Sequence, residues 1–428
     1  MSVPPLPPVK PRLSLVGPGI VVAATGIGAG DLLATLIAGG RFGYVLLWAA
    51  LVGTLLKIAL AEGVGRWTLA SGRTLFDGWA RLPGPGVKVP GGGTLNWAGL
   101  YFGIYAILWG FVYGASAMTA TGLPLTALFP VLDLKSWGMI SGVIGLILVW
   151  LGSYGLFEKI MTGLVAIMFV TVVGLAILVT PDLPRLITGV WPTLSEGSGF
   201  YTLGLIGGVG GTITMAAYGY WLTAKGWKGS EFMPVMRWDN RIAYGMTGVF
   251  VVAMLIVGAE LLHAAGIALA SGDRGLLNLS DVLRERFGQP IAILFLVGFL
   301  ATTFSSLIGV WHGVSLMVTD FVAHALGRSD DPAMTGSKSP AFRGYLLWLT
   351  FPPMALLFMD RPFGLIVAYG VLGSLFMPFL AGTLVWLLNG RFQPAPWRSG
   401  WLSNGALGLA ALLFAVLAGQ QLYEIVTG

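Results

Sequence analysis

The stretch TGIGAGD, from Thr25 to Asp31, decides the fold, because it interrupts an apolar segment that runs from about Leu15 to Ala38. A helix that spans a bilayer keeps its backbone hydrogen-bonded throughout, since lipid offers no replacement partners. Three glycines within five residues weaken such a helix. A break at membrane depth is tolerated only where protein or a water-filled cavity receives the freed backbone groups, so we expect one wall of a binding site here.

The composition is that of a membrane protein. Of the 428 residues, 56% are hydrophobic and 10% are charged, against about 25% charged residues in an ordinary soluble domain. The pI near 9.5 does not indicate nucleic acid binding, because membrane topology alone makes loops basic. The absence of cysteine excludes disulfides and thiolate metal ligands. We predict an all-α polytopic protein whose partners are the lipid bilayer and a small-molecule substrate, with no obligate protein partner.

Eleven apolar runs are long enough to cross a bilayer, which takes about 20 helical residues. They lie at roughly 15–40, 43–65, 95–120, 138–156, 160–180, 202–224, 242–266, 290–322, 342–359, 363–389 and 402–423. Most of the 24 lysine and arginine residues fall in loops on the side of the N-terminus. Because short cytoplasmic loops collect these residues, we predict a multi-pass protein of a bacterial-type plasma membrane, with a cytoplasmic N-terminus and an external C-terminus.

Glycines cluster again in the sixth apolar run, five helices after the first, at Gly204, Gly207, Gly208, Gly210 and Gly211. Interrupted segments at corresponding places in two halves, with an odd number of helices in each half, indicate inverted repeats with a site between the breaks. We predict one transport domain over 1–428, with repeats at 15–180 and 202–389 and an eleventh helix at 402–423. The alternative is that these glycines, among 64 in the chain, only permit close helix packing.

Five ionisable residues fall inside or beside the predicted membrane helices. Burial of a charge in the membrane costs free energy, so each is a functional candidate. Asp31 follows the first break. Its carboxylate could cap the helix that resumes there, and it could also bind the substrate or a proton. We expect Lys57 to be a fixed counter-charge in the first bundle and Glu62 to pair with a basic residue. Glu260 and His263 are three apart near the outer boundary, which favours a structural pair or side chains that reach the membrane surface over a proton relay.

Aromatic and hydroxyl side chains gather near the two breaks. Trp109 and Tyr113 lie four apart in helix 3, and Tyr218 and Trp221 follow the break in helix 6. Helix 8 contributes the polar run 302–306. An aromatic stripe is more often core than ligand, but its position beside a broken helix favours a site.

The run from Gly17-Pro18-Gly19 to Asp31, then Ala38 to Trp48, resembles the first two helices of the Nramp family of transporters. The eleven-helix hydropathy and Phe304-Ser305-Ser306 in helix 8 are similar too. The resemblance implies the amino-acid, polyamine and organocation (LeuT-type) fold, which has two inverted five-helix repeats, unwound helices 1 and 6, and alternating access.

The chain departs from that family at the metal site. Where family metal transporters carry Asp-Pro-Gly-Asn in helix 1, this chain has 28–31 Gly-Ala-Gly-Asp, so Gly28 stands in place of the metal-binding aspartate and Asp31 in place of the asparagine. The Met-Pro-His element of helix 6 matches Met215-Ala216-Ala217, which keeps the thioether and loses the histidine. A transition-metal site needs several converging ligands, and Asp31 with Met215 are too few.

Glycine-exposed backbone, hydroxyls and aromatic side chains predict a transporter or uniporter of a small uncharged polar solute. A monosaccharide such as a hexose is the best candidate, because Trp and Tyr faces can form a platform for a sugar ring and Asp31 can accept its hydroxyl protons. The alternative is a Nramp-related divalent-cation transporter of altered selectivity, with Mg²⁺ as the ion, because Mg²⁺ keeps its waters and needs few protein ligands. Proton symport and passive uniport both stay open. No catalytic residue, resident metal or cofactor is predicted, and nothing supports an enzyme. The predicted substrate-binding residues are Thr25, Gly28, Gly30, Asp31, Trp109, Tyr113, Thr214, Met215, Ala217, Tyr218, Trp221, Ser305 and Ser306.

Overall fold

The computed structural model describes residues 9–11, 17–208, 210–264, 273–359 and 362–427. Within these ranges, the side chains of 29–31, 33, 200, 207–208, 273–277, 362–371, 374 and 424–427 lie outside the description.

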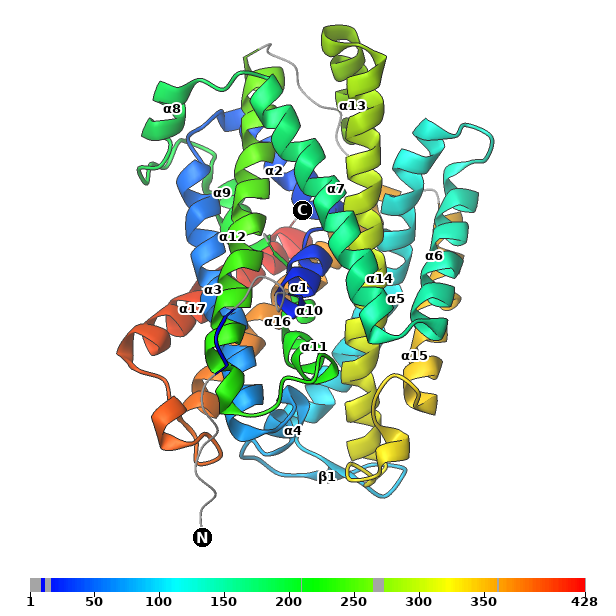
Figure 1. Cartoon of the computed structure of the whole chain (residues 1–428), viewed down its shortest axis with the longest axis vertical. Helices are drawn as coiled ribbons and strands as arrows, with labels where there is room; N and C mark the ends of the chain where they lie inside the picture. Colours follow the sequence, from blue (N-terminus) through cyan, green and yellow to red (C-terminus); the bar gives the residue numbers. More distant parts are fainter. Residues whose placement is uncertain (1–8, 12–16, 209, 265–272, 360–361, 428) are drawn as a thin grey trace.

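The described chain is almost entirely helical, and long helices surround a central group of short ones (Figure 1). The eleven predicted membrane helices are numbered helix 1 to helix 11, and each corresponds to one or more α elements. Helices 1 to 5 are α1 (Pro18–Gly26) with α2 (Ala29–Phe42), α3 (Leu47–Ser71), α5 (Trp97–Leu128), α6 (Leu134–Leu151) and α7 (Tyr154–Leu178). Helices 6 to 10 are α9 (Gly199–Gly208) with α10 (Ile213–Ala216) and α11 (Tyr218–Ala224), α12 (Met233–Gly258), α14 (Gln289–Ala325), α15 (Pro340–Thr350) and α16 (Pro362–Asn389). The last long helix is α17 (Trp401–Thr427).

The connections are short. They contain α4 (Leu75–Ala80), the hairpin of β1 (Val87–Lys88) and β2 (Thr94–Leu95), α8 (Leu183–Thr188) and α13 (Asp273–Phe287). A π-helical turn, Ala259–His263, extends α12, and 3₁₀ turns lie at Ser230–Phe232, Pro332–Met334, Pro352–Phe358 and Ala395–Trp397. The side of the molecule that holds α4 and β1, at the bottom of Figure 1, is called the lower side below.

Eight helices of the described chain are long and apolar enough to cross a membrane. Three further segments are α16 and the two interrupted helices, which consist of α1 with α2 and of α9 with α10 and α11. Together they match the eleven predicted segments one for one. The prediction of an all-α polytopic protein with broken helices 1 and 6 is confirmed. The repeat boundaries at 15–180 and 202–389 stay predictions.

Local sequence explains where the helices begin. Asn96, Asp133, Ser153 and Ser339 each precede a long helix, and each side chain accepts the N–H of the third residue that follows. Such caps satisfy backbone donors that a helix start leaves without a partner. Helix 7 starts at Met233, nine residues before the predicted 242, with Pro234 in its first turn, where a missing N–H costs nothing.

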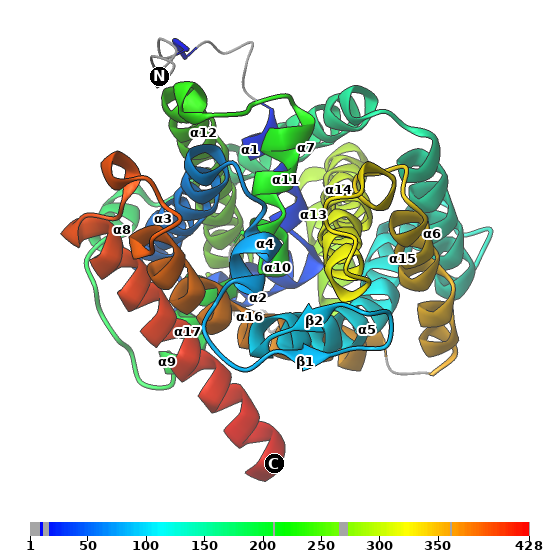
Figure 2. The same cartoon turned by 90° about the horizontal axis from the view of Figure 1, so that it is seen from below.

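The two breaks cross in the middle of the molecule, where α1, α10 and α11 lie between α3 with α12 on one side and α14 on the other (Figures 1 and 2). Ile27 is extended, with φ −97° and ψ 105°, which ends α1. Gly210 and Gly211 have φ of +83° and +91°, values that favour glycine. A β-carbon on Gly26 would lie 2.4 Å from the carbonyl carbon of Gly210, so the two backbones are in direct contact.

Candidate functional site

Hydroxyl groups of the long helices satisfy the carbonyls freed by the break in helix 1. Ser306 Oγ donates to the carbonyl oxygen of Thr25 at 2.9 Å, and Ser305 Oγ makes a longer contact of 3.5 Å to that of Ala24. Tyr113 OH lies 2.9 Å from Ser306 Oγ. Because the one hydroxyl proton of Ser306 goes to Thr25, Tyr113 donates to Ser306. The structure therefore brings four predicted site residues together: Thr25, Tyr113, Ser305 and Ser306.

The break in helix 6 is held from α3 and α12. The ammonium of Lys57 donates to the carbonyl oxygen of Gly211, and Tyr244 OH contacts that of Gly210 at 3.4 Å. Lys57 is completely buried. Its contact joins helix 2 to helix 6, so this charge acts between the two predicted repeats and not only within the first bundle, where the sequence analysis placed it.

The short helix α10 places Thr214 and Met215 at the crossing, and both side chains are buried. A β-carbon on Gly211 would lie 2.6 Å from Thr214 Oγ1, so this hydroxyl faces the crossing. Thr214 Oγ1 has no hydrogen-bond partner among the described residues. Ala217 follows α10 and packs against Gly313 of α14. A buried hydroxyl without a partner is costly, which marks Thr214 as a candidate ligand.

The aromatic residues of the predicted site contact other protein groups. Trp109 and Tyr113 stack with ring centroids 4.6 Å apart. Trp221 Nε1 donates to His312 Nδ1 at 3.0 Å, and Tyr218 OH donates to Asp239 Oδ2 at 2.9 Å. All four aromatic side chains are buried. Their faces are therefore covered in this conformation, and the predicted platform for a sugar ring is not formed.

The remaining predicted residues lie at the start of α2. Gly28 is buried between α1 and α2, and Gly30 and Asp31 are in the first turn of α2. The side chain of Asp31 lies outside the described residues, so its roles as cap or ligand stay predictions. Among the side chains that the structure describes, no three histidine, aspartate or glutamate groups come close enough to hold a metal ion.

Asp239 on α12 is a buried carboxylate that the sequence analysis missed. Its Oδ1 accepts the N–H of Gly17 at 2.9 Å, and its Oδ2 accepts the N–H of Gly19 at 2.6 Å and the hydroxyl of Tyr218. One side chain therefore anchors the start of α1 and the start of α11, the two half-helices beside the crossing. The missed signal was Pro234, which marks a helix start before Asp239 and so places this acid inside helix 7.

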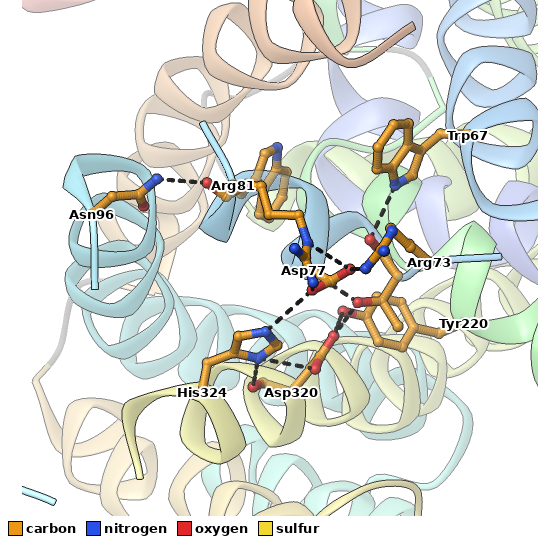
Figure 3. Close-up of polar contacts among 10 residues, drawn as sticks. Trp67, Arg73, Asp77, Arg81, Asn96, Tyr220, Asp320 and His324 are labelled. Atoms are coloured by element: carbon orange, nitrogen blue, oxygen red, sulfur yellow. Dashed lines mark hydrogen bonds and ion pairs between the residues drawn. The ribbon is translucent and has the colours of Figure 1, made fainter. Parts of the chain in front are cut away.

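A second polar cluster ties α4, α11 and α14 together on the lower side, and we call it the lower cluster (Figure 3). Asp77 pairs with Arg73 at 2.8 Å and with Arg81 at 3.2 Å, and it lies 3.6 Å from His324 Nε2. Asp320 accepts the hydroxyl of Tyr220 at 2.8 Å and also that of Thr74. The Tyr220 contact joins the second half of helix 6 to helix 8.

The lower cluster should respond to acid through Asp77, which lies outside the membrane spans. Burial would raise the pKa of Asp77, but hydrogen bonds from His324, Arg73 and Arg81 outweigh it and hold this pKa well below its usual range. A lowered folded-state pKa stabilises the fold above the unfolded value of about 3.9 and loses that effect as the pH falls below it.

We therefore expect Asp77→Asn to lower the free energy of unfolding by about 1.5–3 kcal/mol at pH 7, the range for hydrogen bonds to charged groups. The difference in unfolding temperature from the wild type should narrow below about pH 4, because there the unfolded wild type takes up a proton on Asp77 that the folded state does not yet bind. Thermal unfolding in detergent, followed between pH 7 and pH 3, measures both. A difference that stays constant over this range would contradict the assignment.

The other predicted ionisable residues have partners. Glu62 pairs with Arg66 at 3.3 Å and Arg237 at 3.0 Å, in agreement with the expected pairing to basic residues. Glu260 accepts the hydroxyl of Tyr44 at 2.6 Å, while His263 Nδ1 lies 3.2 Å from the carbonyl oxygen of Gly40. Glu260 therefore contacts the loop after the first helix, and His263 contacts the end of that helix. Whether either residue relays protons stays open.

A family model described as "Natural resistance-associated macrophage protein-like" (Nramp) matches residues 19–424 of the chain. The chain belongs to the Nramp family. The resemblance predicted from helices 1, 2 and 8 is confirmed. As a member of this family the protein is an integral, multi-pass membrane transporter and not an enzyme.

The Nramp chain has curated relatives and solved neighbours. It is 24% identical to the divalent metal cation transporter MntH of Mycobacterium tuberculosis, over 71% of this chain and 69% of the relative. It is 26% identical to the protein of the same name from Deinococcus radiodurans, over 70% and 67% of the two chains. A manganese transporter of Eremococcus coleocola superimposes with a TM-score of 0.76 at 16% identity, covering 99% of this chain and 91% of that one. MhsT in complex with L-phenylalanine gives a TM-score of 0.55 at 14% identity, covering 96% and 99%.

These relatives overturn the predicted sugar substrate, because the curated proteins similar to this Nramp chain are named as divalent metal cation transporters. The physical reason for the error lies in the aromatic residues. A sugar site requires open aromatic faces, whereas Trp109, Tyr113, Tyr218 and Trp221 stack or hydrogen-bond with protein groups and are buried.

Proposed function

We propose that this Nramp protein transports a divalent cation, with Mg²⁺ as the leading ion, which crosses with most of its hydration shell. The observation that supports this most is the crossing of two broken helices in a chain whose family match runs from 19 to 424. The polar groups at this crossing are mainly carbonyl oxygens and hydroxyls. Such hard oxygen groups suit Mg²⁺, which dehydrates reluctantly and is bound by few direct protein ligands.

The proposed ligands are Asp31, Thr214 and carbonyl oxygens at the two breaks. Asp31 is the acidic residue nearest to the first break in the sequence, and Thr214 has a buried hydroxyl without a described partner. Met215 adds a thioether, which prefers softer ions, so Mn²⁺ is the ion to compare. Two other residues of the predicted site support this group, since Ser306 donates to the carbonyl of Thr25 and Tyr113 donates to Ser306.

Transport would proceed by alternating access, with helices 1, 2, 6 and 7 rocking against helices 3, 4, 8 and 9. In the lower cluster, Tyr220 of helix 6 bonds Asp320 of helix 8, which joins one helix of each group, so we assign this cluster to closure of the lower side. Asp239 acts within the first group, where it ties helix 7 to helices 1 and 6. We also propose that the lower side is cytoplasmic, with the N-terminus inside and the C-terminus outside. Arg73, Arg81 and Lys88 lie in the connection between α3 and α5 on that side, as expected for a cytoplasmic loop.

Uptake by purified protein in liposomes tests the function. We expect saturable Mg²⁺ influx, followed with an internal magnesium-sensitive dye, and at least a tenfold loss in Asp31→Asn, which removes the one carboxylate of the proposed site. Asp133→Asn is the matched control, because that exposed residue caps α6 and asparagine caps equally well. Absence of Mg²⁺ and Mn²⁺ flux in the wild type would refute the proposal. A pH gradient across the same liposomes separates proton symport from uniport.

A further inference from the structure

We infer that Lys57 competes with the transported cation for the carbonyl oxygen of Gly211, and so weakens binding and speeds release. This inference rests on the proposed cation transport. It makes Lys57 a determinant of affinity and rate, where the sequence analysis saw only a counter-charge.

The contact of Lys57 is made at the break itself. Its ammonium reaches from the middle of α3 to Gly211, whose φ of +91° takes it out of the helix. In a continuous helix the carbonyl of Gly211 would accept the N–H of Met215, but that N–H instead bonds the carbonyl of Thr212 at 3.1 Å. The Gly211 oxygen is therefore available to a cation, and Lys57 occupies it in this conformation.

The Gly211 position is also part of the proposed ion site. A β-carbon on Gly211 would lie 2.8 Å from the Cα of Gly26 and 2.6 Å from Thr214 Oγ1. The bound carbonyl thus belongs to the residue that contacts both the first break and the hydroxyl without a described partner. A cation at the crossing would have this oxygen within its reach.

Lys57 differs from the other donors described at the breaks in carrying a charge. Ser306 donates to the carbonyl of Thr25 and Tyr244 contacts that of Gly210, both through neutral hydroxyls. The Lys57 ammonium also lies 5.2 Å from the centre of the Phe414 ring on α17, a favourable site for a cation.

Two consequences follow from this charge. An ammonium and a divalent cation both bind electron-rich oxygen, so at the Gly211 carbonyl the two positive charges would lie side by side. They repel each other, and repulsion is strong where water is excluded. Lys57 must give up its contact when the ion binds, and its return to Gly211 helps to expel the ion.

Neutral replacements of Lys57 should therefore tighten binding. We expect Lys57→Met, which keeps the length of the apolar stem and removes the charge, to bind Mg²⁺ at least tenfold more tightly in calorimetry. Its KM for Mg²⁺ uptake and its kcat should both fall, because release becomes slower. Lys57→Gln retains a neutral donor for Gly211 and should shift affinity in the same direction. Lys88→Met, at an exposed lysine of β1, is the control and should leave the affinity, KM and kcat unchanged.

The outcomes separate the two proposals. If the wild type neither binds nor transports Mg²⁺ or Mn²⁺, the proposed function itself is wrong. If the wild type is active and a folded Lys57→Met or Lys57→Gln binds Mg²⁺ equally well or more weakly, the competition is refuted. A purely structural lysine would lower the unfolding temperature and the affinity together. Should Lys57→Met fail to fold, Lys57→Gln decides the question.

Discussion

Replacement of Asp239 by alanine is expected to lower the free energy of unfolding by about 2–5 kcal/mol, because it leaves several buried donors without their acceptor. The N–H groups of Gly17 and Gly19 and the hydroxyl of Tyr218 all end on this carboxylate. Water does not replace the lost hydrogen bonds, because Asp239 and its three donor residues are all buried. The effect should exceed that of any single hydroxyl at the breaks, because the charge serves three donors at once.

The same substitution should impair transport at least tenfold, since α1 and α11 lose their common anchor. Asp239→Asn keeps the shape and one acceptor oxygen, but it turns an amide nitrogen toward a donor, so an intermediate loss is expected. Intrinsic fluorescence during heating measures stability, because the chain contains 16 tryptophans. An unfolding temperature of Asp239→Ala within about 2 °C of the wild type would show that Asp239 does not anchor the half-helices.

The sequence predicted the breaks because their cause is local. Glycines between Gly26 and Gly30 and at Gly210 and Gly211 interrupt apolar runs, and an interrupted run in lipid needs a compensating site. Ser305 and Ser306 were found for the same reason, as polar residues in an apolar helix. These features are defined by residues that are close together in the chain, so the sequence alone reveals them.

Contacts between distant segments were not predictable in this way. Asp239 lies more than 200 residues from the amides that it accepts, and Asp77 is equally far from His324. Both acids fall outside the predicted apolar runs, and no local pattern tells which helix ends meet them. The substrate prediction failed for a related reason: aromatic residues such as Trp221 can be counted in a sequence, but whether their faces are open depends on tertiary packing.

The direct contact between the two breaks predicts a loss of transport in Gly26→Ala. The new β-carbon would lie 2.4 Å from the carbonyl carbon and 2.5 Å from the carbonyl oxygen of Gly210, closer than real β-carbons come. These are backbone atoms, so no side chain can turn aside. The two broken helices must separate, at a cost of about 1–3 kcal/mol for a typical overpacked site.

Separation of the breaks should abolish Mg²⁺ uptake, because the proposed site is formed where they meet. The matched control is Gly163→Ala on α7, where nothing lies within 4 Å of the added methyl group. Alanine there should be neutral or should stabilise the helix by up to about 1 kcal/mol. Uptake and unfolding temperature of both variants, measured in parallel, distinguish the crossing from a general effect of losing a glycine. Wild-type uptake by Gly26→Ala would mean that transport does not require Gly26 and Gly210 to touch, and the ion would then have to be sought away from this crossing.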